Sequence, residues 1–320
     1  MKKITISVPA YNEEENILAF YNKLTSYFKN NIKNYNYELL FINDGSKDNT
    51  GKKIKEIEAI DENVIGIDLS RNYGKEIAMA AGFDHASGDA VITMDADLQH
   101  PFTSIKEMIL LWENGYQDVY GRRIKRHGES FLKVKLSNSY YRLLNKVSQT
   151  KMLSNVGDFR LLDRQVIDSL KKIRERHRYT KGLYEWVGYR KIEFTFEALE
   201  RYTGTTKWNF AGLISLAIEG VTSNSTLPLK FSSYIGFFVS IISILYMIFI
   251  FFTTIINGIP YTGIPTITIL VLFLGGVQLI SLGIIGEYLG RIFIEVKNRP
   301  LYLINESTIK NTNEGLDEEC

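Results

Sequence analysis

The feature that most constrains this chain is a long stretch without charge. From Phe231 to Gly286 the sequence contains no Asp, Glu, Lys or Arg. A transmembrane helix needs roughly 20 apolar residues to cross about 30 Å of hydrocarbon. Residues 232–256 and 266–286 each meet that length, and the Gly- and Pro-rich segment NGIPYTGIP (257–265) between them is typical of a turn. The sequence therefore predicts a two-helix transmembrane hairpin, which fits the missing charges better than a buried hairpin in a soluble core.

The charges that flank this hairpin predict its orientation. Lys230 precedes the first span, and Arg291, Lys297 and Arg299 follow the second, whereas the connecting turn carries no charge. Positively charged flanks stay on the cytoplasmic side of a membrane, so we expect the N-terminal region and both termini to be cytoplasmic in a multi-pass protein of the cell membrane. The only cysteine, Cys320, excludes a disulfide framework and agrees with a cytoplasmic location.

Strand and helix patterns alternate before the hairpin. Repeated βα units with apolar strands predict a mostly parallel sheet with helices on both faces. In such a sheet ligands bind beyond the carboxyl ends of the strands, so the loops Pro9–Glu13, Asn43–Ser46 and Asp95–His100 should lie together. The net charge of +2 offers no field for nucleic acid, and none is expected as a partner. The strand patterns cover 3–8, 37–42, 64–69 and 89–94, and the helical patterns cover 13–28, 50–59 and 75–86.

Two carboxylates follow the fourth predicted strand. Residues 94–101 read MDADLQHP, which places Asp95 and Asp97 at the end of an apolar run. Two close carboxylates repel each other, and one takes up a proton unless a cation lies between them. Mg²⁺ or Mn²⁺ prefers oxygen ligands and binds through one or two carboxylates plus the phosphates of a substrate. We therefore expect Asp95 and Asp97 to hold such a cation with Gln99 as a third ligand; a solvated turn is the alternative for so short a motif.

Several longer motifs occur in order along the chain. The first four are VPAYNEEENI (8–17), NDGSKDNT (43–50), RNYGKEIAMAAGFDHASGD (71–89) and MDADLQHP (94–101). Together they resemble the glycosyltransferase family 2 enzymes with the GT-A fold. The later motifs narrow the resemblance to the polyisoprenyl-phosphate glycosyltransferases, the group that holds dolichol-phosphate mannose synthase and the bactoprenol glucosyltransferases. These are GDFRLLDR (157–164), RHRYTKGLYEWVGYR (176–190), RYTGTTKW (201–208) and IIGEYLGRIFIEVKNRPLYLI (284–304).

The resemblance implies a fold in four parts. Residues 1–205 would form an α/β GT-A catalytic domain with a Rossmann-like, mostly parallel sheet, and 206–230 an amphipathic interface segment. Residues 231–290 would form the hairpin, and 291–320 a cytosolic C-terminal tail. Segment 131–147 mixes apolar and cationic residues, and segment 208–220 is apolar with one late charge. Helices like these can lie in a membrane interface, although ordinary core helices remain an alternative, more so for the second segment.

The resemblance also implies a nucleotide-diphosphate sugar as donor. The loop RYTGTTKW would close over its diphosphate, and Asn43 stands where the family often has Asp. Packing is the alternative role for Tyr11, and a charge at a helix N-terminus is the alternative for Glu13. The metal ligands would be Asp95, Asp97 and Gln99. The donor-binding residues would be Pro9, Tyr11, Glu13, Asp44, Lys75, Asp95, Arg201 and Lys207.

The implied reaction is attack of a lipid phosphate on the anomeric carbon of the sugar, which inverts that centre. A phosphate monoester has a second pKa near 6 and is largely dianionic, so the acceptor needs little base catalysis. We expect Asp97, Asp158 and Arg123 to act in catalysis. Attraction to anionic lipid headgroups is an alternative for the basic residues, and a structural Asp–Arg pair is one for Asp158. The acceptor phosphate would be bound by Arg123, Lys133, Lys135 and Arg160.

The resemblance favours UDP-glucose as donor and undecaprenyl phosphate as acceptor, for glycosylation of the cell envelope. UDP-N-acetylglucosamine, UDP-galactose and GDP-mannose are the alternative donors. A processive polysaccharide synthase would carry a Q-x-x-R-W motif and more spans, and the sequence contains neither. A membrane scaffold that binds nucleotide sugar without catalysis, and a hairpin that moves lipid-linked sugar across the membrane, are further alternatives. A homo-oligomer is expected from the resemblance and the apolar hairpin.

Overall fold

A computed structural model describes residues 1–124, 156–199, 227–257 and 263–307 of the chain. These residues form two units. The first unit holds the described residues before position 200 together with Pro300–Ser307, and the second holds Leu227–Arg299. The chain thus leaves the first unit, forms the second, and then returns to the first.

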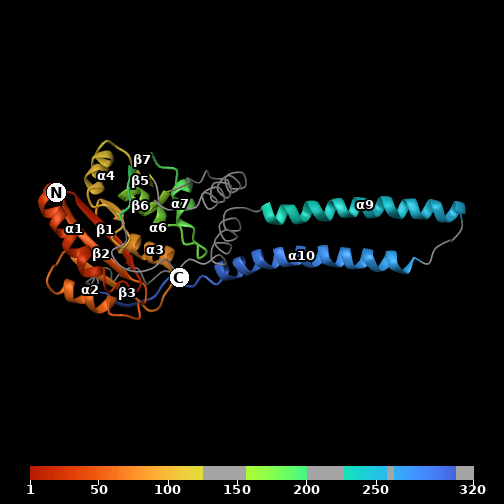
Figure 1. Cartoon of the computed structure of the whole chain (residues 1–320), viewed down its shortest axis with the longest axis horizontal. Coiled ribbons are helices and arrows are strands. Elements are labelled where there is room, and N and C mark those ends of the chain that lie inside the picture. The colour runs from red at the N-terminus through yellow and green to blue at the C-terminus, as the bar shows by residue number, and fades with distance from the viewer. Residues whose placement is uncertain (125–155, 200–226, 258–262, 308–320) are drawn as a thin grey trace. The chain divides into compact units, whose positions relative to one another are not determined.

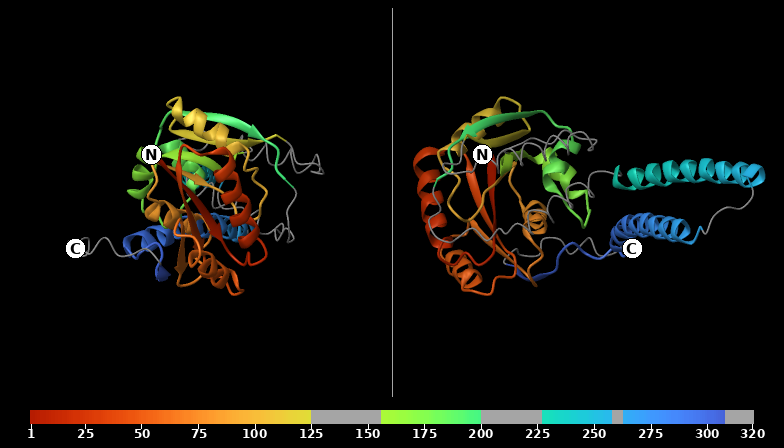
Figure 2. Two further views of the ribbon diagram at one scale, coloured as in Figure 1. Left: turned by 90° about the vertical axis from the view of Figure 1, so that its left-hand side faces the viewer. Right: turned by 45° about the vertical axis from the view of Figure 1, so that its right-hand side comes forward.

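The first unit is built on an eight-stranded sheet (Figures 1 and 2) with the strand order β7-β5-β6-β4-β1-β2-β3-β8. Its central strands are apolar along most of their length, and all four residues of β4 are buried. Such continuous burial is typical of strands covered on both faces. The strands are β1 (Lys3–Ala10), β2 (Asn36–Asn43), β3 (Val64–Leu69), β4 (Ala90–Thr93), β5 (Asp118–Arg123), β6 (Val156–Asp163), β7 (Lys191–Phe196) and β8 (Ile304–Ser307).

The strand directions bring many loops to one edge of the sheet. Strands β1 to β4 are parallel, β6 is antiparallel to both β4 and β5, and β7 is parallel to β5. The carboxyl ends of β1 to β5 and of β7 therefore share an edge with the amino end of β6, and we call it the carboxyl edge. Strand β8 is antiparallel to β3 and begins at this edge, where Ile304 lies opposite Leu69. The predicted mostly parallel sheet is confirmed.

Helices cover both faces of this sheet (Figure 1). In α1 the buried residues Ile17, Phe20, Leu24 and Phe28 follow helical spacing and form one apolar stripe. Helix α3 packs so closely on β1 that a Cβ atom added at Gly82 would lie 2.1 Å from a side-chain oxygen of β1. One face carries α1 (Ile17–Asn31), α2 (Thr50–Glu58) and α4 (Ser104–Glu113), and the other carries α3 (Lys75–His85), α6 (Arg164–Lys171) and α7 (Thr180–Trp186).

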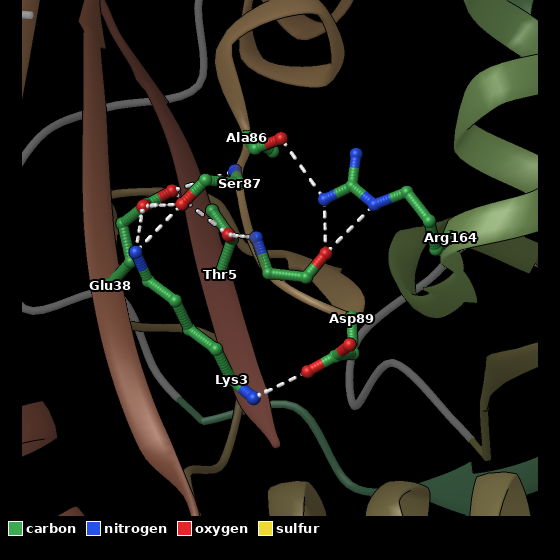
Figure 3. Close-up of polar contacts among 8 residues, drawn as sticks. Lys3, Thr5, Glu38, Ala86, Ser87, Asp89 and Arg164 are labelled. Atoms are coloured by element: carbon green, nitrogen blue, oxygen red, sulfur yellow. Dashed lines mark hydrogen bonds and ion pairs between the residues drawn. The ribbon is translucent and has the colours of Figure 1, made fainter. Parts of the chain in front are cut away.

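A polar cluster links the amino ends of β1, β2 and β4 (Figure 3). Glu38 is only 2% exposed, and its Oε1 accepts hydrogen bonds from Thr5 Oγ1 at 2.9 Å and from the backbone N–H of Ser87 at 3.0 Å. Lys3 Nζ lies 2.7 Å from the other carboxylate oxygen. The Arg164 guanidinium donates to backbone carbonyls of the same loop before β4. This cluster ties β1, β2 and α6 to the start of β4.

The second unit consists of two long helices, α9 (Leu227–Asn257) and α10 (Ile264–Val296), which contact each other. Within them Leu229–Ile250 has a mean hydropathy of 2.2 and Phe273–Val296 has one of 1.4. Both segments are long and apolar enough to cross a membrane. Helix α10 continues beyond the charge-free run, with Arg291 Nε 3.1 Å from Glu287 one turn earlier. The two interface segments, 131–147 and 208–220, lie outside the described residues.

Candidate active site

The first two predicted loops meet at the carboxyl edge. The backbone N–H of Asn12 donates to Ser46 Oγ at 3.0 Å, and Asn12 Oδ1 accepts from the N–H of Lys47 at 2.9 Å. Asn12 adopts a left-handed conformation with φ 55°, which Asn tolerates better than most residues. Pro9 lies near the end of β1, and the Tyr11 ring beyond it is exposed. The loops after β1 and β2 therefore form one joined surface.

Glu13 and Asp44 both have contacts within the protein. Glu13 Oε2 accepts a hydrogen bond from the Asn16 side chain at 2.6 Å, directly before α1. Asp44 is buried and accepts from the N–H groups of Tyr73 at 2.7 Å and Gly74 at 2.9 Å. Burial raises the pKa of Asp44, and the two backbone hydrogen bonds only partly oppose it. Asp44 thus fixes the loop before α3, while a donor contact for Glu13 or Asp44 stays a prediction.

Lys75 joins two acidic residues from different strands. It is the first residue of α3 and follows Gly74, whose φ of 93° suits glycine best. Its Nζ lies 2.7 Å from Asp95 Oδ1, just beyond β4, and 2.9 Å from Asp158 Oδ2, near the start of β6. The parts of the chain after β3 and after β4 and the first residues of β6 therefore meet in one charged cluster at the carboxyl edge.

Electrostatics keep this cluster ionised at neutral pH. Burial acts to raise the pKa of Asp95, but Lys75 outweighs it and lowers the pKa to about 2. Burial likewise opposes ionisation of Asp158, and Lys75 again lowers the net pKa. Burial acts to lower the pKa of Lys75, but the two carboxylates raise it above its ordinary value. The three side chains thus carry one positive and two negative charges.

The loop after β4 is held in a specific conformation. Leu98 is buried with a left-handed φ of 61°, which is rare for a bulky side chain. Asp97 Oδ1 accepts from the N–H of Gln99 at 3.2 Å. His100 Nδ1 accepts from the N–H of Asp95 at 3.2 Å, and its ring stacks on an aromatic ring of β6. Burial lowers the pKa of His100, so it is neutral and braces the loop.

The residues present suit a divalent cation that is bound partly by protein carboxylates and partly by oxygen atoms of a substrate. Among the described residues no group of three or more His, Cys, Asp or Glu side chains could hold a metal alone. Asp95 and Asp97 offer two carboxylates, and Mg²⁺ commonly uses one or two carboxylates together with phosphate oxygens. Asp158 Oδ1 is in addition buried without a hydrogen-bond partner in the described part of the chain. The hard oxygen donors therefore fit the predicted Mg²⁺ or Mn²⁺.

Comparison with known proteins identifies the family. The family described as "Glycosyl transferase family 2" matches residues 5–171, which is half of the chain. The chain belongs to glycosyltransferase family 2. A second family, "GtrB C-terminal hairpin", matches residues 227–292 of this glycosyltransferase, over α9 and most of α10. These matches confirm both the predicted family and the predicted resemblance to polyisoprenyl-phosphate glycosyltransferases.

Individual relatives match this glycosyltransferase over nearly its whole length. The SfII prophage-derived bactoprenol glucosyl transferase of Shigella flexneri is 45% identical over 305 residues, which cover 95% of this chain and 98% of the relative. The protein CsbB of Bacillus subtilis is 48% identical over 309 residues, which cover 96% and 93%. Among solved structures, mannosyl-3-phosphoglycerate synthase from Rubrobacter xylanophilus is 13% identical with a TM-score of 0.49, covering 69% of this chain and 72% of that one.

The two arginines expected near the acceptor of the glycosyltransferase occupy different places. Arg123 ends β5 and so lies at the carboxyl edge. Arg160 is only 2% exposed, with Nη1 2.8 Å from Asp118 and its guanidinium 3.8 Å from the Tyr184 ring centre. Arg160 is thus held by Asp118 and Tyr184 inside the unit, and a contact of Arg160 with the acceptor phosphate stays a prediction. The other cationic candidates, Lys133, Lys135, Arg201 and Lys207, lie outside the described residues.

Sequence reasoning missed two residues of the glycosyltransferase site. Lys181 lies at the start of α7, and its charge helps to lower the pKa of Asp95 and of Asp158. Glu76 Oε2 accepts from the N–H of Thr180 at 2.9 Å, which ties this part of α7 to α3. Burial raises the pKa of Glu76, and the nearby Asp158 charge adds to the rise. Both residues lie inside quoted motifs, but nothing in their spacing showed that they face the acidic cluster.

Proposed function

We propose that this glycosyltransferase moves one sugar from a nucleotide-diphosphate sugar to polyisoprenyl phosphate. The observation that carries the proposal is the cluster of Lys75, Asp95 and Asp158 at the carboxyl edge, with Asp97 in the same loop as Asp95, in a chain that also forms an apolar hairpin. Relatives named bactoprenol glucosyl transferase support a glucosyl donor, UDP-glucose, and an undecaprenyl phosphate acceptor. The product would be a lipid-linked sugar for cell-envelope glycosylation.

The donor is proposed to bind over the joined loops of β1 and β2, with its diphosphate toward the acidic cluster. Asp95 and Asp97 would hold Mg²⁺ or Mn²⁺ with Gln99 as a third ligand. When bound, the metal stabilises the negative charge that develops on the departing nucleotide diphosphate. Asp95 is ionised at neutral pH, as a metal ligand must be. The other proposed donor-binding residues are Pro9, Tyr11, Glu13, Asp44, Lys75, Arg201 and Lys207.

The acceptor is proposed to be positioned by cations instead of being activated by a base. A phosphate monoester is already largely dianionic at neutral pH, because its second pKa is near 6. Arg123 at the end of β5 would hold that phosphate bidentately, with Lys133 and Lys135 as further contacts. Asp158 would orient the reacting groups while Lys75 holds its carboxylate. Direct attack on the anomeric carbon inverts that centre.

The hairpin is proposed to anchor the enzyme in the cell membrane with both termini in the cytoplasm. The acceptor headgroup then lies at the surface where the catalytic unit is tethered, so its polyprenyl tail need not leave the bilayer. Lys230, Lys297 and Arg299 flank the apolar segments and favour this orientation. A homo-oligomer in the membrane belongs to the same proposal.

Membranes that contain the full chain test the proposal directly. They are incubated with Mg²⁺, undecaprenyl phosphate and a panel of labelled nucleotide sugars, and the lipid fraction is then extracted. We expect UDP-glucose to label the lipid best and the product to have the inverted anomeric configuration. Asp97→Ala should lower labelling on the order of 100-fold or more, because it removes a direct metal ligand.

The matched control is Asp168→Ala, which removes an exposed carboxylate of α6 far along the chain from the acidic motif. It should retain full labelling. Preference for UDP-N-acetylglucosamine, UDP-galactose or GDP-mannose would change the proposed sugar and keep the reaction. Nucleotide-sugar binding without labelled lipid would indicate a scaffold, and full activity of Asp97→Ala would contradict the metal site.

A further inference from the structure

The cation position beside Asp95 is filled by a side chain of the protein itself. Lys75 Nζ contacts Asp95 Oδ1 at 2.7 Å and Asp158 Oδ2 at 2.9 Å, so one ammonium group bridges two carboxylates. A divalent cation bound by Asp95 would meet this ammonium at close range. Two cations beside one carboxylate repel each other strongly where the local dielectric is low. Lys75 and the metal therefore compete for Asp95.

The placement of Lys75 is built into the loop before α3. Asp44 holds the N–H groups of Tyr73 and Gly74, and Gly74 turns the chain with a positive φ into the first residue of the helix. A positive charge at a helix N-terminus is unfavourable because the macrodipole is positive there. The position of Lys75 is thus electrostatically unfavourable within its own helix, and the ion pairs with Asp95 and Asp158 offset this unfavourable energy. A residue that breaks a local rule in this way marks a functional position.

The charge balance of the cluster decides what it can bind. Asp95, Asp97 and Asp158 carry three negative charges, and Lys75 and Lys181 supply two positive charges nearby. Cation affinity rises with the number of charged ligands that remain uncompensated. With Lys75 in place, the loop after β4 has little net charge for a divalent ion. A nucleotide diphosphate would bring the missing negative charge.

We infer that Lys75 is a built-in counter-ion that prevents Asp95 and Asp97 from retaining a divalent cation until the nucleotide donor binds. This inference rests on the proposed function and adds an order to it: metal and donor bind together. The Lys75 side chain is 45% exposed and is not fixed in a core, so it can leave Asp95. The diphosphate then replaces Asp95 as its partner, because a lysine ammonium suits phosphate as a point charge.

Metal binding measured without turnover tests the inference. Mn²⁺ is titrated into the purified full chain in detergent, with and without UDP, and free Mn²⁺ is followed by electron paramagnetic resonance. The wild-type chain should bind Mn²⁺ weakly alone and tightly with UDP. Lys75→Met should bind Mn²⁺ alone at least about tenfold more tightly, because a positive charge has been removed from direct contact with a ligand. The increase in Mn²⁺ affinity on adding UDP should be smaller for Lys75→Met than for the wild-type chain.

The matched control is Lys181→Met. Lys181 faces the same carboxylates, but within the described residues it forms no ion pair with Asp95 or Asp158. Its loss should raise affinity for Mn²⁺ alone by less than about threefold, as expected for a more distant, screened charge. Adding Asp95→Asn to Lys75→Met should abolish the gain, which would locate the bound ion at Asp95.

The outcomes separate this inference from the proposed function. If the wild-type chain binds Mn²⁺ with UDP but Lys75→Met binds Mn²⁺ alone no better than wild type, Lys75 is not a counter-ion and the metal site remains. If the wild-type chain binds no Mn²⁺ even with UDP, both the metal site and the inference are wrong. A purely structural Lys75 would give a lower Tm and weaker binding in Lys75→Met, and tighter binding would contradict that role.

Discussion

Glu38 shows at the scale of one residue how a buried carboxylate stabilises this fold away from the active site. It accepts hydrogen bonds from Thr5 and Ser87 and pairs with Lys3. Burial acts to raise the pKa of Glu38, but these partners outweigh it and lower the pKa below its ordinary 4.5. The folded protein therefore holds the charged form more firmly than the unfolded chain does. The contacts by which Glu38 links the starts of three strands are therefore strongest while it is ionised.

We predict that Glu38→Gln lowers the Tm of the detergent-solubilised chain by about 4–8 °C at pH 7. The lost charge-assisted hydrogen bonds are worth about 2 kcal/mol in a unit of this size. A lowered pKa gives stability that is complete above pH 4.5 and is lost as the pH falls through the folded value. The difference in Tm between wild type and variant should therefore shrink below pH 4.5.

Thermal unfolding at a series of pH values, monitored by circular dichroism, checks this prediction. Asp168→Asn, at an exposed position on α6, is the control and should unfold like the wild type throughout. A difference in Tm that stays constant or grows on acidification would show that Glu38 does not act through its charge.

Asp158 and Arg160 show which properties of a site residue the sequence could not predict. Both belong to one motif and lie two positions apart on β6. Asp158 lies near the start of β6, which is at the carboxyl edge, whereas Arg160 lies about 6.6 Å further along the strand. That step takes Arg160 into the core, where it pairs with Asp118. The motif showed which residue types are present. How deeply each side chain is buried depends on where β6 begins, and the motif does not indicate that position.

At the scale of elements, the apolar and turn pattern of the sequence was sufficient to predict the first four strands but not the last one, β8. Strands β1 to β4 are apolar runs between turn signals, and they occur where predicted. Strand β8 reads INES and lies within the segment assigned to the tail. It has no apolar alternation, and its partner β3 lies more than 200 residues earlier in the chain. Only the tertiary structure supplies that pairing.

We predict that ending the chain after Arg299 exposes the edge of β3. The lost contacts are the β8 pairing, the hydrogen bond from the N–H of Ser70 to the carbonyl of Leu303 at 2.9 Å, and that from Tyr302 to Asp84 at 2.8 Å. Backbone amides of β3 should exchange roughly 5–10-fold faster in hydrogen–deuterium exchange, as expected from the loss of about one net hydrogen bond each.

A chain that ends after Ser307 keeps β8 and is the control for this truncation. Its β3 amides should exchange at the rate of the full chain. Equal exchange in both truncated chains would mean that β8 does not protect this edge.

At the scale of the whole molecule, the hairpin is inserted between two parts of one sheet. Strands β1 to β7 precede α9, and β8 follows α10. Because all of them belong to the same sheet, the two ends of the hairpin must lie on the same side of any membrane that it crosses. Two spans satisfy this condition and one span does not. The connectivity thus requires both hairpin ends to lie on one side, and the flanking charges are the reason to propose that this side is the cytoplasm.

Cysteine labelling tests that orientation. Cys320 is the only cysteine of the chain, so it reports on the C-terminus without any engineering. A membrane-impermeant maleimide should label it only after the cells are permeabilised. In the Cys320→Ser background, Thr262→Cys in the segment between α9 and α10 should be labelled on intact cells, because that segment carries no charge to retain it inside. Labelling of Cys320 on intact cells would contradict a cytoplasmic C-terminus.

Because the chain returns to pair with β3 only at its end, the parts of the sheet are synthesised in a fixed order. A ribosome makes the seven strands of β1 to β7 first, then both apolar helices, and the last strand only after them. The edge of β3 in the nascent catalytic unit therefore lacks its β8 partner while the hairpin is synthesised. Its sheet reaches full width only once both apolar helices have been synthesised, so the edge beside β3 is the last part of the sheet to be completed.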